Sequence, residues 1–331
     1  MSDTTPLALT DRKILVTGVQ GFIGIHTAAA VHRMGARLVG VDVVAQSQRA
    51  DRVRESLGYP PVAVHAVDLR DAEATVQILR QMRPEMVIHC AGSIERTDES
   101  SSWNRAFEGN AALTASLVDA LVGFPEPERP VLVMPGSQME YGTAPMPWTE
   151  DRHCEPFNAY GAGKLAAAES VLGAVRRDGL RACVLRLPIV FGPGQPPSLF
   201  VPELIGKALL REAIPMTVGD QRRAFLYVDD AAGLLLESGI RAAQPAPFPP
   251  LLNAPAYPPM AILDVARMVA ESLDAAGLLR VGALPRRAGE LLEAWPDASL
   301  ARSLGFCTRN QPLEAIRRTV AWYEANRWFL S

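Results

Sequence analysis

The sequence is poor in the residue types on which metal sites, disulfide frameworks and lysine chemistry depend. Only three of its 33 basic residues are lysines, so a lysine in a chemically useful position is hard to dismiss as background. The cysteines form no CxxC pair and stand beside no histidine cluster, which argues against a zinc site and a disulfide-stapled fold. We therefore expect no metal and four buried, inert thiols: Cys90, Cys154, Cys183 and Cys307.

Long apolar runs and a strong net charge are absent as well. No apolar run reaches the ~18 residues needed to cross a bilayer, and the N-terminus lacks a basic segment followed by an apolar core. The formal net charge of −3 gives no electrostatic reason to expect nucleic acid or an anionic membrane as a partner. These absences predict a cytoplasmic protein.

What is present is the alternation typical of a Rossmann α/β fold, a doubly wound parallel sheet covered by helices. Of 331 residues, 48% are hydrophobic, enough for a large core. Short β-branched runs alternate with longer amphipathic stretches. We predict strands at 13–18, 37–43, 61–68, 85–91, 130–136 and 181–188, and helices at 21–35, 71–82, 111–122 and 159–179.

The regular alternation weakens after Pro188. A loop rich in glycine and proline follows over 192–197, and a second proline-rich stretch covers 243–250. We predict a dinucleotide-binding domain over 1–188 and a smaller α/β substrate-binding lobe over 189–331, with some segments returning to the first domain. The cleft between two such lobes is the natural substrate site.

A spaced set of three glycines predicts the cofactor site. The strand KILVT runs into TGVQGFIG, which places Gly18, Gly21 and Gly24 between a strand and a helix. Gly18 would permit the tight turn, Gly21 the approach of a pyrophosphate, and Gly24 close packing of the helix on the sheet. A tight turn without a ligand is the alternative, but the flanking strand and helix favour a dinucleotide.

Acidic residues at two strand ends bear on the choice of cofactor. Asp42 ends the second strand at about the ~20-residue offset expected of a ribose ligand. Its carboxylate would accept hydrogen bonds from ribose hydroxyls and repel a 2′-phosphate, so NAD is favoured over NADP. A turn cap is the alternative for Asp42, and for Asp68 a turn cap and an adenine contact both stay open.

The spacing of Tyr160 and Lys164 in NAYGAGK predicts a catalytic site. Four residues apart on a helix, the two share one face, and the ammonium would stabilise the phenolate so that the tyrosine can take a hydroxyl proton near neutral pH. Ser137, at the end of a neighbouring strand, supplies a hydroxyl to hold the substrate oxygen. An ordinary turn residue is the alternative for Ser137 when it is considered alone.

Together these motifs make the sequence resemble the extended short-chain dehydrogenases/reductases, the NAD-dependent epimerase/dehydratase group that acts largely on nucleotide sugars. The resemblance spans nearly the whole chain and rests on TGVQGFIG, VDL, HCAG, Asn110, GSQMEYG, PFNAYGAGK, LRLPIVFGPG, RAFLYVDD, RAGE and TVAWYEAN. It implies a catalytic triad of Ser137, Tyr160 and Lys164, with the lysine also on the nicotinamide ribose.

The resemblance also implies contacts around both ligands. Arg223 and Arg287 would hold the substrate pyrophosphate, a role that suits arginines. The expected substrate residues are Gln138, Met139, Ile189, Arg223, Arg287 and Glu290. The expected NAD residues are Gly18, Gly21, Phe22, Ile23, Gly24, Asp42, Asp68, Leu69, Ala91, Gly92, Asn110, Tyr160, Lys164 and Pro188.

Two departures from the family pattern limit the substrate assignment. Gln138 and Met139 stand where dehydratases commonly have an acidic pair, which disfavours a 4,6-dehydratase. Ile189 replaces an asparagine that helps many relatives to bind the diphosphate. We therefore expect a 4-epimerase or 4-ketoreductase of a nucleotide sugar, with an NAD-dependent dehydrogenase of a small sugar acid or polyol and a nonenzymatic NAD sensor as alternatives. The family commonly dimerises through two helices, here expected around 97–122 and 157–177.

Overall fold

The computed structural model describes residues 9–95, 99–286 and 289–330. Two compact units can be distinguished along the chain. The first comprises residues up to 144, then 152–186 and 232–252, and the second comprises 145–151, 187–231 and 253–331. Within the described residues, no helix is both long and apolar enough to cross a bilayer.

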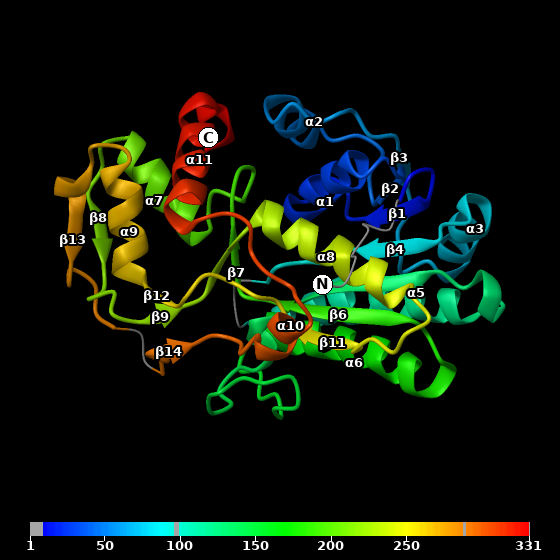
Figure 1. Cartoon of the computed structure of the whole chain (residues 1–331). Coiled ribbons are helices and arrows are strands. Elements are labelled where there is room, and N and C mark those ends of the chain that lie inside the picture. Colours follow the sequence, from blue (N-terminus) through cyan, green and yellow to red (C-terminus); the bar gives the residue numbers. More distant parts are fainter. Residues whose placement is uncertain (1–8, 96–98, 287–288, 331) are drawn as a thin grey trace. The chain divides into compact units, whose positions relative to one another are not determined.

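The first unit is built on a seven-stranded sheet of order β11-β6-β5-β4-β1-β2-β3 (Figure 1). Strand β1 pairs in parallel with β2 and β4. The pairs β2–β3 and β4–β5 are parallel as well. Its strands are β1 (Lys13–Thr17), β2 (Arg37–Asp42), β3 (Val64–Ala66), β4 (Met86–His89), β5 (Val131–Ser137), β6 (Ala182–Leu187) and β11 (Leu251–Asn253). This order is the doubly wound Rossmann arrangement that the sequence predicts.

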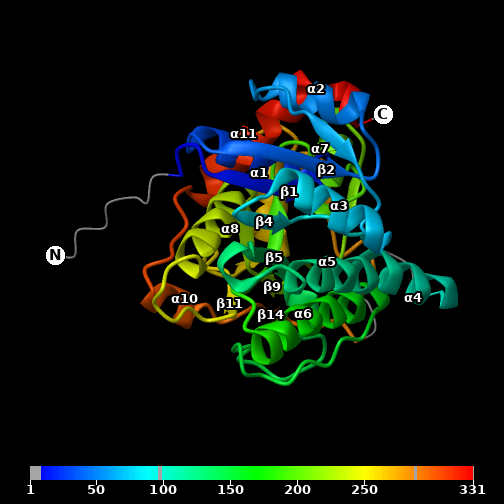
Figure 2. The same ribbon diagram turned by 90° about the vertical axis from the view of Figure 1, so that its right-hand side faces the viewer.

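Helices cover both faces of the sheet. Figure 2 shows α1 on one side of β1 and β4, and α3, α5 and α6 on the other. The helices of this unit are α1 (Phe22–Arg33), α2 (Gln48–Ser56), α3 (Ala72–Met82), α4 (Ser100–Ala106), α5 (Leu113–Val122) and α6 (Ala159–Asp178). A π-helical turn, η1 (Phe107–Ala112), joins α4 to α5, and 3₁₀ turns lie at η2 (Glu126–Glu128) and η3 (Gln138–Glu140).

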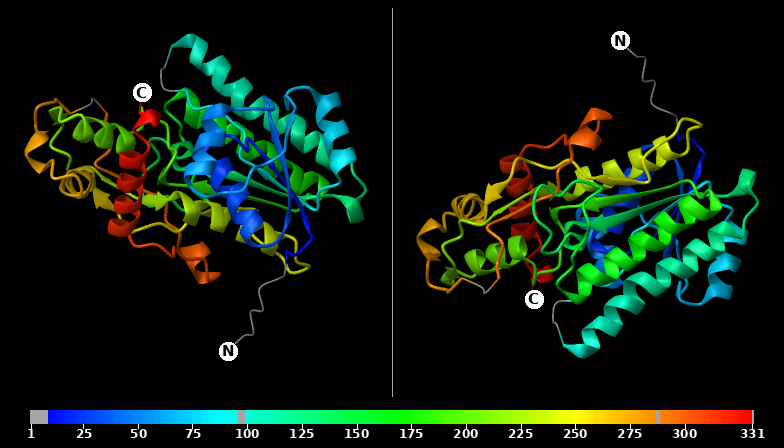
Figure 3. Two further views of the ribbon diagram at one scale, coloured as in Figure 1. Left: turned by 90° about the horizontal axis from the view of Figure 1, so that it is seen from above. Right: turned by 90° about the horizontal axis from the view of Figure 1, so that it is seen from below.

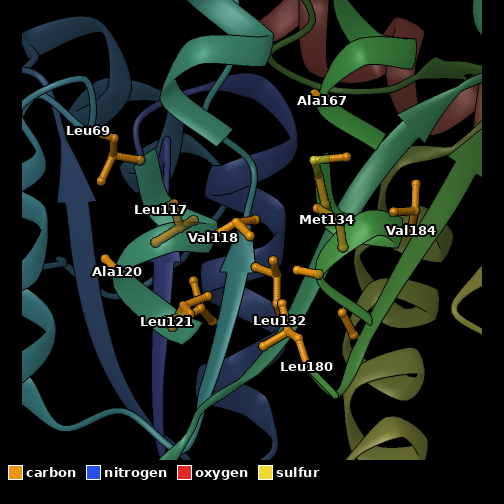
Figure 4. Close-up of a cluster of buried hydrophobic side chains, with 14 of the residues drawn as sticks. Leu69, Leu117, Val118, Ala120, Leu121, Leu132, Met134, Ala167, Leu180 and Val184 are labelled. Carbon is orange, nitrogen blue, oxygen red and sulfur yellow. The ribbon is translucent and has the colours of Figure 1, made fainter. Parts of the chain in front are cut away.

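Apolar side chains between the sheet and these helices form one continuous core. Leu132 and Met134 of β5 belong to the same buried cluster as Leu117 and Leu121 of α5 (Figure 4). Seen from below in Figure 3, α6 and the α4–η1–α5 stretch run side by side. Burying apolar surface stabilises a fold by roughly 25 cal/mol per Å². The core between the sheet and these helices is therefore a main source of the stability of the first unit.

Most predicted elements of this unit are confirmed, with one shortened strand. The segment 61–68 contributes only Val64–Ala66 to the sheet. Pro60 and Pro61 precede it, and proline has no backbone N–H with which to extend a ladder. The strand is therefore short and lies at the edge of the sheet.

The second unit combines small sheets with three packed helices. Strand β7 (Ile189–Phe191) pairs with β10 (Phe225–Tyr227), β9 (Arg222–Arg223) lies between β12 (Met260–Ala261) and β14 (Glu293–Ala294), and β8 (Ile214–Met216) pairs with β13 (Leu279–Val281). Helices α7 (Phe200–Leu209), α9 (Ile262–Glu271) and α11 (Pro312–Ala325) contact one another (Figure 1). The remaining elements are α10 (Ser299–Ser303), η4 (Ala276–Leu278) and η5 (Arg327–Phe329), while α8 (Val228–Ala242) contributes residues to both units.

The cysteine prediction is partly wrong. All four residues are free thiols, but Cys307 is exposed, Cys90 and Cys154 are half-buried, and only Cys183 is fully buried. Among the described residues, no group of histidine, cysteine or acidic side chains could hold a metal ion.

Candidate active site

The glycine loop between β1 and α1 has the close backbone packing that its sequence predicts. Gly18 has a φ of 62°, and a Cβ there would lie 2.6 Å from the backbone of Ala91. A Cβ on Gly24 would lie 2.0 Å from the carbonyl oxygen of Gly18. Both positions therefore require glycine, and the loop leads directly into the N-terminus of α1, a favourable place for phosphate.

Asp42 lies at the end of β2 and contacts this loop. Its Oδ2 accepts a hydrogen bond from the backbone N of Gln20 at 3.0 Å, and its Oδ1 accepts one from Val43 N at 2.9 Å. The carboxylate thus caps the turn, which was one of its two predicted roles. Each oxygen retains acceptor capacity for a ribose hydroxyl, so the cap and the ribose contact are compatible.

Asp68 at the end of the β3 segment is bound by a neighbouring arginine. Its carboxylate accepts from Arg70 N at 3.0 Å and from Arg70 Nη2 at 2.6 Å. The side-chain hydrogen bond from Arg70 is the main reason why the pKa of Asp68 is lowered. The side chain of Leu69 lies in the core, so only its backbone is available to a cofactor.

Asn110 is buried and holds the loop that follows β4. Its Nδ2 donates to Ser93 O at 3.1 Å and to Ala106 O at 3.0 Å, and a Cβ on Gly92 would lie 2.8 Å from its Oδ1. The amide therefore fixes the segment that carries Ala91 and Gly92 beside the glycine loop. Phe22 and Ile23 are half-buried in the first turn of α1.

The three predicted catalytic residues come from β5 and α6. Asn158 caps α6 by accepting a hydrogen bond from Gly161 N at 2.8 Å, which fixes where the helix begins. The Tyr160 side chain lies close enough to Ser137 for the serine side chain to lower the pKa of Tyr160. Lys164 is buried, and its Nζ donates to Pro135 O at 2.6 Å, two residues before Ser137. The structure thus brings this triad together at the end of β5.

The pKa of Tyr160 is shifted in the direction opposite to the sequence-based expectation. Burial raises the pKa of Tyr160 to about 12, the interaction with Ser137 lowers it, and the Glu140 carboxylate raises it. Burial likewise lowers the pKa of Lys164. The expected depression of the tyrosine pKa by Lys164 is not found, because desolvation dominates and the ammonium is directed to the Pro135 carbonyl.

The other predicted substrate residues next to Ser137 belong to η3. Gln138 is buried, and its Oε1 has no hydrogen-bond partner in the described structure. Met139 is half-buried, and its backbone N donates to Ser137 Oγ at 3.2 Å. A buried acceptor without a donor is costly, so Gln138 is suited to receive a hydrogen bond from a ligand.

The remaining predicted residues belong to the second unit, and Arg287 lies outside the described residues. Ile189 is half-buried at the start of β7, directly after Pro188. Arg223 in β9 donates to the carbonyl oxygens of Leu291 at 2.8 Å and Arg222 at 2.8 Å. Burial lowers the pKa of Arg223, whereas the charge of Glu290 raises it.

Sequence reasoning missed two groups of buried polar residues near the triad. His89 lies between Thr17 (2.8 Å) and Thr114 (3.1 Å), and burial lowers its pKa to about 3. Glu140 and Arg186 form a buried ion pair. The sequence contained a signal for this pair. Glu140 and Arg186 each stand in a largely apolar segment, PVLVMPGSQMEYG and RACVLRLP, and a buried charge requires a partner.

Comparisons with known proteins identify the family of this chain. The family described as "NAD dependent epimerase/dehydratase family" matches residues 14–238. The dTDP-L-rhamnose 4-epimerase of Burkholderia thailandensis is 27% identical, covering 92% of this chain and 96% of its own. The dTDP-6-deoxy-L-talose 4-dehydrogenase (NAD(P)(+)) of Kitasatospora kifunensis is also 27% identical, covering 92% and 93%.

Among solved structures, UDP-glucuronic acid 4-epimerase from Bacillus cereus has the same fold, with a TM-score of 0.81 at 21% identity. The match covers 95% of this chain and 99% of that protein. The family match spans well over half of the chain and includes the glycine loop, Ser137, Tyr160 and Lys164. The chain therefore belongs to the NAD-dependent epimerase/dehydratase family, as its motifs predict, and it is an enzyme whose cofactor is NAD.

Proposed function

We propose that this enzyme oxidises or reduces C4 of a nucleotide sugar, as a 4-epimerase or a 4-ketoreductase, with Tyr160 as its acid/base. The observation that carries the proposal is the convergence of three side chains at the end of β5: Ser137, the neighbouring Tyr160, and the buried Lys164, whose Nζ donates to Pro135 O at 2.6 Å. The names of both relatives at 27% identity specify reactions at position 4 of a dTDP-sugar.

The residues divide the chemistry as follows. The Ser137 hydroxyl binds the substrate oxygen, and Tyr160 exchanges the proton of that oxygen. The NAD held by these residues would supply the acceptor and donor of the hydride. Asp42 would hold its ribose, and Gly18, Gly21 and Gly24 would make room for its pyrophosphate.

The raised pKa of Tyr160 bears on the direction of reaction. A tyrosine that keeps its proton is ready to donate it to a ketone oxygen, so the protonated form serves the reducing step directly. Oxidation of an alcohol requires the phenolate, whose fraction rises about tenfold per pH unit below the pKa. We therefore expect the rate of oxidation to increase with pH.

Gln138 separates this proposal from dehydration. An amide cannot supply a proton as a carboxylic acid does, and the neighbouring Met139 is apolar. The pair is therefore unsuited to eliminating water from a sugar. The unpartnered Oε1 of Gln138 is suited instead to accepting a hydrogen bond from a sugar hydroxyl.

In the second unit, we propose that Arg223 and Glu290 contribute to substrate binding; Arg287, which lies outside the described residues, is a further candidate from the sequence alone. An arginine fork fits a diphosphate well. Two N–H groups of Arg223, however, already donate to the backbone carbonyls of Arg222 and Leu291. In addition, the side chain of Ile189 has no polar group with which to bind a phosphate. Those two observations favour, as a second candidate, an NAD-dependent dehydrogenase of a small sugar acid or polyol.

One experiment separates the two candidates. Purified enzyme is incubated with UDP-, dTDP-, GDP- and CDP-sugars, with and without NADH, and the configuration at C4 is followed by NMR. An epimerase changes that configuration without net formation of NADH. Net NADH from a free sugar acid, with no benefit from an attached nucleotide, supports the second candidate, and no change in any nucleotide sugar overturns the first.

We also propose that the enzyme is a homodimer that pairs through α4, α5 and α6. Trp103 and Phe107 expose 43% and 57% of their surface on α4 and η1. Large exposed apolar side chains on neighbouring turns are typical of an interface. Light scattering of the wild type and of a Trp103→Ser, Phe107→Ser variant tests this, and a monomeric wild type contradicts it.

A further inference from the structure

Two buried charges lie beneath the turn that carries Ser137. Glu140 is 0% exposed and Arg186 is 2% exposed. Arg186 Nε donates to Glu140 Oε2 at 2.6 Å, and the other carboxylate oxygen accepts from the backbone N of Ser137 at 2.7 Å. One carboxylate therefore connects the end of β6 to the catalytic serine at the end of β5.

The surroundings hold this pair in one position. A Cβ on Gly136 would lie 2.9 Å from Glu140 Oε1 and 3.1 Å from Arg186 Cγ, so the pair occupies the space that a side chain there would need. The Arg186 guanidinium lies 4.5 Å from the centre of the Tyr141 ring, and its Nη2 is 3.2 Å from Cys154 Sγ. The carboxylate therefore has little freedom to move.

Stability alone is a weak explanation for such a pair. Replacing a buried ion pair with apolar residues of similar volume is often neutral or stabilising, because desolvating two charges is costly. Burial raises the pKa of Glu140, and the permanently charged Arg186 guanidinium acts in the opposite direction. The pair therefore places a carboxylate, bound to a fixed cation, beneath the turn that carries Ser137.

This carboxylate acts on the groups that face it. Arg186 comes from β6, Lys164 and Tyr160 from α6, and Cys154 from the segment before α6. The carboxylate favours the charged form of Lys164 and opposes the charged form of Tyr160. Its position thus bears both on where Ser137 lies and on when Tyr160 loses its proton.

We propose that Glu140 and Arg186 form a positioning pair: the carboxylate fixes the turn that presents the Ser137 hydroxyl, and the arginine holds that carboxylate in place. This inference rests on the proposed function of Ser137 and Tyr160. Neither residue of the pair is assigned a contact with substrate or cofactor. Their effect is exerted through the serine turn and through the charge beside the tyrosine.

The test begins with Glu140→Gln, which preserves shape and one acceptor but removes the charge. We expect kcat to fall about tenfold or more, while KM for the sugar and Kd for NAD change by less than about twofold. The ionisation of Tyr160 is followed by tyrosinate absorbance, as the difference between each protein and the same protein carrying Tyr160→Phe. In Glu140→Gln, Tyr160 should ionise at lower pH than in the wild type. The matched control Glu314→Gln, in the exposed Glu314–Arg318 pair, should change none of these values.

A second variant, Glu140→Gln with Arg186→Met, removes both charges and decides the question if the single variant does not fold. A positioning role predicts a folded protein that keeps the lowered kcat and the shifted tyrosine titration. Recovery of wild-type kcat and titration, or failure of the double variant to fold, makes the pair purely structural and overturns the inference.

The absorbance titration needs no substrate and so separates this inference from the proposed function. If no sugar is turned over but Tyr160 still ionises at lower pH in the folded Glu140 variants, the proposed substrate is wrong and the effect of the pair on Tyr160 holds. If nucleotide sugars are turned over but neither kcat nor the titration responds to Glu140→Gln, the proposed function holds and the inference fails.

Discussion

The two units hold their predicted site residues in different ways. In the first, Ser137 ends a buried strand and Tyr160 and Lys164 lie early in a capped helix, so the backbone positions them rigidly. In the second, Arg223 lies in a two-residue strand and donates to the carbonyls of a neighbouring segment. From this difference we expect the chemistry to depend on the regular elements of the first unit, and the contribution of Arg223 to substrate choice to depend on a short strand and its neighbouring loop.

The largest expected effect comes from Tyr160→Phe, which removes only the hydroxyl. Loss of a general acid/base typically costs a factor of ~10²–10⁴, so kcat should fall by about that factor. NAD affinity, measured by titration calorimetry, should stay within about twofold. A variant with the wild-type kcat would show that Tyr160 is not the acid/base, and would contradict the assignment of the chemistry to the first unit.

Asp42→Ser tests cofactor selection in the first unit. A hydrogen bond to a charged group contributes ~1.5–3 kcal/mol, so NAD should bind about 10- to 100-fold more weakly, with a smaller loss for NADP. Calorimetry with both cofactors measures this, and Asp119→Ser on the exposed surface of α5 serves as the control. Equal losses for both cofactors would assign Asp42 to the turn alone.

Arg223→Met tests the second unit. A phosphate-binding arginine contributes mainly to binding, so KM for the nucleotide sugar should rise about tenfold while kcat changes little. Arg222→Met is the matched control, because the exposed Arg222 donates to Pro259 O and has no predicted ligand role. An unchanged KM favours the sugar-acid alternative.

A separate prediction concerns stability rather than catalysis, namely the acid stability of the first unit. Burial holds the pKa of His89 at about 3, below its ordinary value of 6.5, so between these values the unfolded chain binds a proton that the folded chain excludes. The free energy of unfolding should fall by about 1.4 kcal/mol per pH unit as pH decreases through this window. Urea denaturation at several pH values gives the free energy of unfolding as a function of pH. The slope of this plot should be shallower by that amount in His89→Gln than in the wild type, and identical slopes for the two proteins would contradict this role of His89.

What the sequence predicted correctly was local. Gly18 and Gly24 follow from one short loop, and the positions of Tyr160 and Lys164 follow from a four-residue spacing on one helix. The pKa of Tyr160 was not predictable in this way, because burial by the folded chain decides its direction. The spacing of residues along a helix shows which side chains are neighbours, but it does not show how deeply the folded chain buries them.

What the sequence did not reveal depends on contacts between distant segments. Glu140 and Arg186 are 46 residues apart and meet only because β5 and β6 are neighbours in the sheet. The helix predicted over 111–122 begins upstream as α4 and passes through a π-helical turn that places Asn110 against the loop after β4. Neither feature follows from periodicity alone.

The most direct test of the account uses a nucleotide sugar of the panel that carries deuterium at C4. If C4 is the carbon that exchanges a hydride, the labelled sugar should react more slowly than the unlabelled one, and Tyr160→Phe should slow turnover of both by a factor of ~10²–10⁴. Equal rates for the two sugars in a single-turnover measurement, together with no deuterium on the cofactor when the reaction is quenched during turnover, would contradict chemistry at C4.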